Sequence, residues 1–172
     1  KENPLTNAKE LETLVKECFG ADQREMHYFA IELLGYHKKL WSKQTISLIE
    51  WMITHKSWWD SVDSTNSHII GKFFLQFPNY IPSTTLKWNK SSDLWLRRMS
   101  ILFQLLYKEK TQTDLLSKYI ENCQLEENFF IRKAIGWALR SYAYTHKKWV
   151  IHFVKNHPLL STLSKREALK HC

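Results

Sequence analysis

The sequence predicts an all-α fold in which antiparallel helix pairs stack into a solenoid with a basic concave groove. Only four Gly and four Pro punctuate the 172 residues, too few for the many tight turns of a strand-rich fold. Apolar residues recur at helical spacing, whereas β-type alternation never extends beyond a few residues. A period of about 34 residues runs through the chain, as expected of a helical repeat.

The first part of the chain is predicted to form three helices. The first covers residues 5–18 and ends at F-G-A-D. Asp22 is expected to cap the second, at residues 23–39, which turns Tyr28 toward the core. A shorter third helix reaches Ile53.

A fourth helix is predicted to start in the stretch T-H-K-S-W-W-D-S-V-D-S-T-N-S-H-I-I-G, residues 54–71. We interpret Ser57 and Asp60 as a capping box. The Ser57 hydroxyl would accept from the first free backbone N–H groups, and the Asp60 carboxylate would reach back. The helix should continue to Phe77, where Pro78 ends it.

Two faces of that helix differ in character. Trp58 falls on an apolar face and is expected in the core. The other residues of this face are Val62, Ile69 and Phe73. Trp59 and Asp63 lie four residues apart on a neighbouring face, which places an indole beside a carboxylate. Core packing does not require a carboxylate there, so this pair is a candidate for function.

The rest of the chain continues in the same way. The capping signals are Ser91 or Ser92, Thr113, Asn128, and Ser161 or Ser164. The expected elements are a helical turn at residues 82–88, helices at residues 93–108, 113–123, 128–144 and 146–156, and a last piece K-R-E-A-L-K.

An internal register supports a HEAT-like or ARM-like repeat. The stretches A-I-E-L-L, N-S-H-I-I, S-I-L-F and A-I-G-W begin at Ala30, Asn66, Ser100 and Ala134, at spacings of 36, 34 and 34 residues. In each repeat a long helix carries the apolar stretch and a shorter helix follows. Stacking would bring several charged and aromatic side chains onto one concave surface. They are Asp63, Arg97, Arg98, Arg132 and Trp137.

The charge of the chain indicates a polyanionic partner. The formal net charge is +8 and the isoelectric point is about 9.4, which favours nucleic acid or an acidic membrane surface. A basic protein with scattered lysines is the alternative. No apolar run approaches the ~20 residues of a membrane span, and no signal peptide is visible. The opening K-E-N-P-L reads as a loop, so we expect the chain to begin partway through a longer protein.

The cysteines argue against a metal centre or a disulfide framework. Cys18, Cys123 and Cys172 are far apart, odd in number and form no C-x-x-C motif. We therefore expect no metal and no cofactor, and a reducing compartment such as the bacterial cytosol or nucleoid.

Each candidate residue has a structural alternative. Trp59 could be core with Asp63 as a solvated carboxylate, and Arg98 could form a surface ion pair with Asp93 or Glu109, which would contribute little. Trp137 could be a core residue whose small neighbours allow tight helix packing. Core packing does not require this combination of residues on adjacent repeats: a carboxylate, an arginine and two indoles. Taken together, they are therefore candidates for function.

Four blocks in this sequence carry a family resemblance: T-H-K-S-W-W-D-S-V-D, W-L-R-R-M-S-I-L-F-Q-L, F-F-I-R-K-A-I-G-W-A-L-R and L-S-K-R-E-A-L-K. In order and spacing they resemble the AlkD-type DNA alkylation repair proteins, a family of HEAT-like alkylpurine DNA glycosylases. The resemblance covers about residues 24–172. It departs at the front, where the family has further N-terminal helices. We therefore expect residues 1–172 to form a single HEAT-like domain that lacks some of those helices.

The resemblance implies hydrolysis of the N-glycosidic bond of cationic purines, of the 3-methyladenine or 7-methylguanine type, in duplex DNA. It places Asp63, Trp59, Trp137 and Arg98 at the catalytic positions. Asp63 would stabilise positive charge on the deoxyribose and orient water, the indoles would face the cationic nucleotide, and Arg98 would hold a phosphate. Further candidates for DNA phosphate contacts are Lys56, Arg97, Arg132, Lys133, Arg140, Lys165 and Arg166.

The expected partner is double-stranded DNA containing alkylated purines. We expect the protein to bind it as a monomer and not to associate with a membrane. Two other function classes remain open. A non-catalytic relative could bind distorted or branched DNA by shape, although it would not need Asp63. A protein–protein scaffold is the second, and its binding would be insensitive to salt, unlike phosphate binding.

Overall fold

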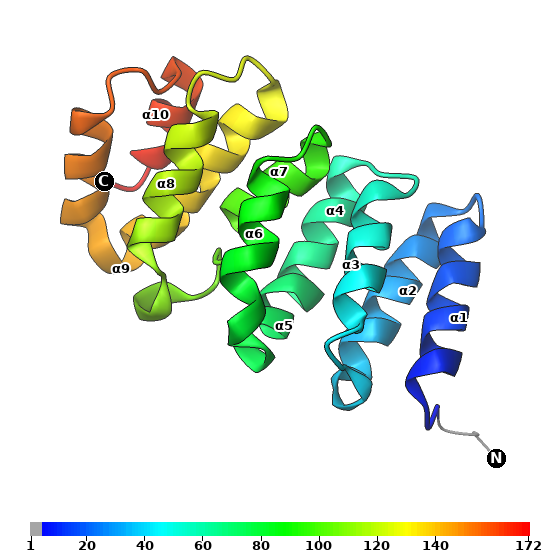
Figure 1. The fold of residues 1–172 in the computed structure, drawn as a ribbon. Coiled ribbons are helices and arrows are strands. Elements are labelled where there is room, and N and C mark those ends of the chain that lie inside the picture. The colour runs from blue at the N-terminus through cyan, green and yellow to red at the C-terminus, as the bar shows by residue number, and fades with distance from the viewer. Residues whose placement is uncertain (1–4) are drawn as a thin grey trace. The chain divides into compact units, whose positions relative to one another are not determined.

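The computed structural model describes residues 5–172 and is helical throughout, with no strand in this part of the chain (Figure 1). This confirms the all-α prediction. The chain divides into two compact units, Lys1–Pro78 and Asn79–Cys172. Because each unit is compact by itself, the expectation of a single domain stays a prediction.

In the first unit, helices pack on their neighbours in pairs. α1 packs on α2, α2 packs on α4 and on the π-helical segment η2, and α3 packs on α4. The elements are α1 (Ala8–Gly20), α2 (Arg24–Tyr36), the 3-10 turn η1 (Lys38–Leu40), α3 (Thr45–Thr54), α4 (Trp59–Thr65), η2 (Asn66–Ile70) and α5 (Gly71–Gln76). The core side chains between them are fully buried and apolar. They include Val15, Phe19, Ile31, Ile49, Ile53, Val62, Ile69 and Phe73.

The predicted capping box at the start of α4 is wrong. The helix begins at Trp59, and its N-cap Trp58 has an extended backbone and makes no side-chain cap. Ser57 instead donates its hydroxyl to the Ile53 carbonyl at the end of α3, at 2.5 Å. The serine therefore finishes one helix rather than starting the next, because a backward hydrogen bond competes with the cap.

The environment of Trp58 and Tyr28 also differs from the prediction. Trp58 is 51% exposed, since it precedes the helix and does not share the apolar face of Val62. Tyr28 is 37% exposed rather than inward. Asp22 does not cap α2, whose N-cap is Gln23 without a side-chain hydrogen bond. The end before Pro78 is confirmed, because α5 stops at Gln76.

In the second unit, α6 packs on α7, α7 on α8 and α9, and α10 on α9. The elements are α6 (Ile81–Asn89), α7 (Leu94–Leu102), the 3-10 turn η4 (Lys108–Lys110), α8 (Thr113–Cys123), α9 (Phe129–Asn156) and α10 (Thr162–Ala168); a 3-10 turn η3 (Pro78–Tyr80) lies at the division between the units. The caps Asn128 and Ser161 are confirmed. α9 includes both predicted helices, with a break at His146.

The helix predicted at residues 93–108 is shorter in the structure. Asp93 is itself the N-cap of α7 and accepts from the backbone N–H groups of Trp95 and Leu96, at 2.8 and 2.9 Å. The helix ends at Leu102. Gln104 is buried and its side-chain oxygen accepts from the Gln112 N–H at 2.7 Å, so it fixes a loop there instead of another helical turn.

The predicted register corresponds to buried positions. Ala30, Asn66, Ser100 and Ala134 are at most 5% exposed. They lie on α2, η2, α7 and α9, and within each unit these helices pack on each other, α2 on η2 and α7 on α9. Within each unit, the repeat seen in the sequence therefore marks buried positions on helices that pack on each other.

Gly136 lies at a close contact between α9 and α10. A Cβ at this position would lie 2.4 Å from the Glu167 Cβ and 3.1 Å from the Ser164 carbonyl oxygen. Neither neighbour is the end of a flexible side chain, so α10 would have to shift. Gly136, the small residue before Trp137, thus allows tight helix packing, as the sequence predicts for the small neighbours of Trp137.

We expect Gly136→Ala to lower the free energy of unfolding by about 1–3 kcal/mol, because the new methyl group overpacks this contact. Gly20→Ala is the matched control, since a Cβ there meets nothing within 4 Å. Chemical denaturation of both variants measures the effect. Equal stability of the two alanine variants would contradict the packing argument.

Candidate functional site

The predicted pair Trp59 and Asp63 lies on α4, one helical turn apart. Trp59 is 48% exposed, so the alternative that it is a core residue is excluded. Asp63 is half-buried, and its backbone carbonyl accepts from the Ser67 hydroxyl at 3.1 Å. The π-helical η2 begins three residues after Asp63, and such segments inside helices are frequent at functional sites.

The start of α4 is held by side chains of α2. The Arg24 guanidinium forms an ion pair with the Asp60 carboxylate, and the Tyr28 hydroxyl donates to the same carboxylate at 2.9 Å. Arg24 also donates to the Lys56 carbonyl at 3.3 Å. Partial burial would raise the pKa of Asp60. The hydrogen bonds from Tyr28 and the Ser61 N–H, together with the charge of Arg24, outweigh burial and lower it.

Lys56, a predicted phosphate ligand, makes structural contacts. Its ammonium donates to the carbonyls of Gly20 and Ala21 at 2.8 and 2.9 Å and to the Asp22 carboxylate at 3.0 Å. An ammonium has three N–H donors, so a phosphate would have to displace one of these partners.

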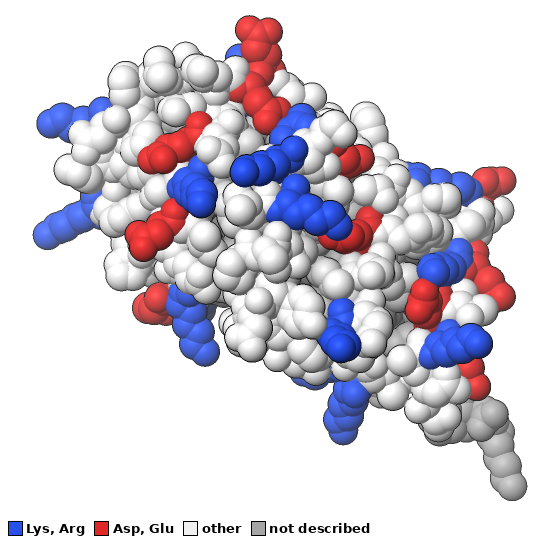
Figure 2. Space-filling view, viewed as in Figure 1, with Lys and Arg blue, Asp and Glu red and all other residues white. Residues whose placement is uncertain are grey.

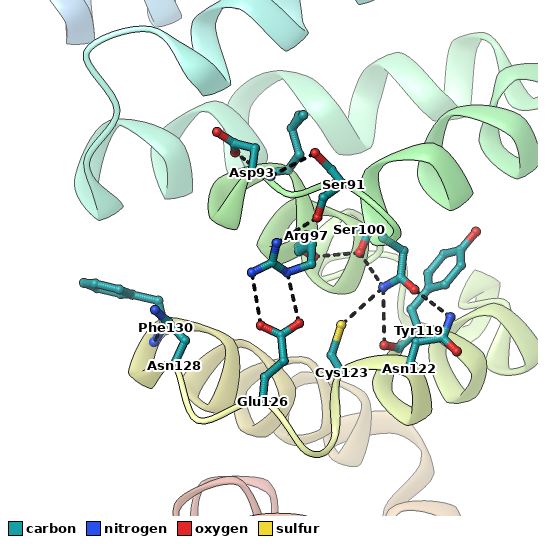
Figure 3. Close-up of polar contacts among 12 residues, drawn as sticks. Ser91, Asp93, Arg97, Ser100, Tyr119, Asn122, Cys123, Glu126, Asn128 and Phe130 are labelled. Atoms are coloured by element: carbon teal, nitrogen blue, oxygen red, sulfur yellow. Dashed lines mark hydrogen bonds and ion pairs between the residues drawn. The ribbon is translucent and has the colours of Figure 1, made fainter.

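In the second unit, Arg97 connects the beginning of α7 to the loop before α9 (Figure 3). Its guanidinium donates to both oxygens of Glu126, at 2.9 and 3.2 Å, and to the Ser91 carbonyl at 2.7 Å. A bidentate pair of this geometry is stronger than a single surface ion pair. The side chain that was predicted to contact phosphate therefore has a structural role.

Arg98 is buried, at 4% exposure, and donates to the Phe130 carbonyl in the first turn of α9 at 2.5 Å. The alternative of a surface ion pair is therefore excluded. Its contact with a phosphate stays a prediction, and so does any role in catalysis.

Trp137 and the remaining cations belong to α9 and α10. Trp137 is partly exposed. The Arg132 guanidinium donates to the Glu126 carbonyl at 2.9 Å. Two other side chains of α9, Lys133 and Arg140, form ion pairs with Glu167 of α10 at 3.3 and 2.6 Å.

Burial would raise the pKa of Glu167. The hydrogen bond and charge of Lys133 and the charge of Arg140 outweigh it and lower the pKa.

Two predicted cations lie on α10. The Lys165 ammonium donates to the Pro158 carbonyl at 2.7 Å. Arg166 is exposed. Of the predicted phosphate ligands on this helix, Arg166 is thus the one whose side chain reaches the surface most fully.

Acidic side chains accompany the basic ones. On the face shown in Figure 2, Asp and Glu lie among Lys and Arg in each unit. Trp59 and Asp63 belong to the first unit and Arg98 and Trp137 to the second, so their convergence in one groove stays a prediction. Over residues 5–172, no group of three His, Cys, Asp or Glu side chains is placed to hold a metal ion, and no helix is long and apolar enough to span a membrane.

Sequence reasoning missed the acidic partners of these cations. They are Asp60 as the partner of Arg24, Glu126 and Glu167. Each pair joins residues about thirty positions apart, a distance over which helical spacing gives no signal. The period of about 34 residues is the one clue, because it brings such positions onto adjacent helices.

Comparisons with known proteins agree with this architecture. The family model described as DNA alkylation repair enzyme matches residues 1–172. A solved structure, described as a predicted DNA alkylation repair enzyme from Enterococcus faecalis, superposes with a TM-score of 0.90 at 32% sequence identity. The match covers 96% of this chain and 77% of that one. The comparison with curated proteins gives no match.

We expect Arg97→Ala to lower the free energy of unfolding by about 1–3 kcal/mol, because it leaves Glu126 without its bidentate partner. Arg166→Ala removes the same charge from an exposed position and should change stability by less than about 0.5 kcal/mol. Denaturant titration of both variants distinguishes the two roles. A negligible effect of Arg97→Ala would show that its side chain is not structural.

The stability that Glu167 contributes should depend on pH in a defined direction. Folding lowers its pKa, so the ionised group stabilises the fold above the unfolded value of about 4.3, and the effect is lost as the pH falls through the lower folded value. Glu167→Gln should therefore be about 1 kcal/mol less stable than wild type at pH 7, with the gap closing below about pH 4. Denaturation at several pH values measures the gap, and one that stays constant down to pH 3 would contradict the assignment.

Proposed function

The chain belongs to the DNA alkylation repair enzyme family, and from that premise we propose that it is a DNA glycosylase. Its substrates would be cationic N-alkylated purines, of the 3-methyladenine or 7-methylguanine type, in duplex DNA. The observation that carries the proposal is the pairing of a half-exposed indole, Trp59, with the Asp63 carboxylate one turn further along α4.

Hydrolysis of the N-glycosidic bond of a cationic purine requires little acid–base catalysis. Alkylation of a purine ring nitrogen leaves the base with a positive charge, so it departs as a neutral molecule without protonation by a general acid. Positive charge develops on the deoxyribose as the N-glycosidic bond breaks. A fixed carboxylate beside the sugar stabilises that charge and can orient the attacking water. We assign this part to Asp63.

The aromatic residues have a matching role. An indole face attracts a cation, and Trp59 presents about half of its surface to solvent. Trp137, partly exposed on α9, is proposed to contact the nucleotide in the same way. This mechanism requires neither a metal nor a cofactor.

DNA binding is proposed to depend on a smaller set of cations than the sequence suggests. Arg166 is exposed and can reach a phosphate directly, whereas Lys56, Arg97 and Lys133 have structural partners. Arg98 is buried and donates to the Phe130 carbonyl, and its contact with a phosphate is part of the proposal. A monomer acting in a bacterial cytosol remains part of the proposal.

The deciding experiment compares release of free base from randomly methylated duplex DNA by the wild type and Asp63→Asn. We expect release by the wild type and a loss of at least about 100-fold in the variant, because the charge that stabilises the sugar is removed. Asp114→Asn is the matched control, since Asp114 is an exposed aspartate in the first turn of α8. Circular dichroism should show that both variants remain folded.

The other outcomes identify the competing functions. Wild-type release by Asp63→Asn would contradict the role of Asp63. No release by either protein, with DNA binding that weakens steeply as salt rises, would indicate a non-catalytic DNA binder. Binding partners whose affinity does not depend on salt would indicate a scaffold.

A further inference from the structure

The first turn of α4 has no cap of its own. Its N-cap Trp58 contributes no side-chain cap hydrogen bond, and Ser57 is directed to the preceding helix. The first backbone N–H groups of a helix have no partner within it and need one from elsewhere. The Asp60 carboxylate accepts from the Ser61 N–H at 2.6 Å. The turn that carries Trp59 therefore depends on Asp60.

Asp60 is itself fixed from α2. Arg24 and Tyr28 each contact one of its two carboxylate oxygens, so the group cannot rotate without losing a partner. Arg24 also donates to the Ser61 hydroxyl at 3.4 Å. Arg24 donates to the Lys56 carbonyl as well. One arginine therefore contacts residues that precede and residues that follow the two tryptophans.

Trp59 is not held by packing in the core, because nearly half of its side chain is exposed. Its position therefore depends on the backbone of the turn in which Asp60 accepts from the Ser61 N–H. Asp63 follows in the same short helix, so a shift of the first turn would move the indole and the carboxylate together. Catalytic groups need positions accurate to about 0.5 Å.

We propose that Asp60, held by Arg24 and Tyr28, is a positioning residue that orients Trp59 and Asp63 for the reaction. The inference rests on the proposed glycosylase function for its effect on rate. Asp60 does not touch the substrate in this scheme. Arg24 forms an ion pair with Asp60, and Asp63 is the carboxylate of α4 to which the proposed function assigns the sugar cation.

The first test is the kinetics of Asp60→Asn. The amide keeps the shape of the side chain and can still accept hydrogen bonds, but it loses the ion pair with Arg24. We expect the single-turnover rate of base release to fall about tenfold, while the Kd for duplex DNA changes less than about twofold, as misplacement of catalytic groups predicts. Tyr28→Phe removes one hydrogen bond and should lower the rate less, by about threefold.

Asp22→Asn is the matched control. Asp22 forms an ion pair with Lys56 in the same corner of the unit, but its side chain is 97% exposed and lies outside α4. Its rate should equal that of the wild type. A rate for Asp60→Asn equal to that of Asp22→Asn would overturn the inference while leaving the glycosylase proposal intact.

A second measurement does not need activity. In protein labelled with 5-fluorotryptophan, the ¹⁹F resonance of Trp59 is identified by its loss in Trp59→Phe. We expect Asp60→Asn to shift or broaden that resonance and to leave the Trp137 resonance unchanged. An unmoved Trp59 resonance would overturn the inference. Absence of base release by the wild type would instead contradict the proposed function, so the two failures are distinguishable.

Discussion

In each unit, an arginine of one helix contacts the first turn of a helix that packs on it. In the first unit Arg24 of α2 binds Asp60 at the start of α4, and in the second Arg98 of α7 donates to the Phe130 carbonyl at the start of α9. Helical repeats bury their apolar faces only against their neighbours. The arginine contacts add a polar interaction at the helix ends to this apolar packing. The register positions Ala30 and Ser100 are buried on the same helices, α2 and α7.

Contacts of this kind also change how the positive charge of the chain is interpreted, because cations that bind protein groups are less available to DNA. A net charge of +8 indicates a polyanionic partner, yet several of the cations at the predicted groove positions bind carboxylates or carbonyls of the protein. Arg97 pairs with Glu126 in the loop before α9, and Arg140 pairs with Glu167 on α10. Fewer phosphate contacts should remain, so the salt dependence of DNA binding is expected to be shallower than a count of groove cations implies. Arg166 is the clearest candidate to contribute to it.

Apolar spacing predicted the helices well because each layer has one buried face, and the caps Asn128 and Ser161 were readable because both act within one turn. The errors at the start of α4 arose where another partner competed with the predicted cap, one distant in sequence and one nearby. Ser57 and Asp60 have the spacing of a capping box, but Arg24 takes the carboxylate and the serine turns back to Ile53. The candidate pair Trp59 and Asp63 was found from spacing, whereas the network that holds it could not be.

The beginning of α4 departs from the local rules that the rest of the chain follows. It lacks a side-chain cap, exposes two adjacent tryptophans, and passes into a π-helical segment within two turns. The missing cap is offset from α2, where Arg24 and Tyr28 contact the Asp60 carboxylate in the first turn. Sites where local preference is overridden and supported from elsewhere are where function is expected. The exposed indole and the carboxylate of Asp63 are the two groups on this turn that such support would place.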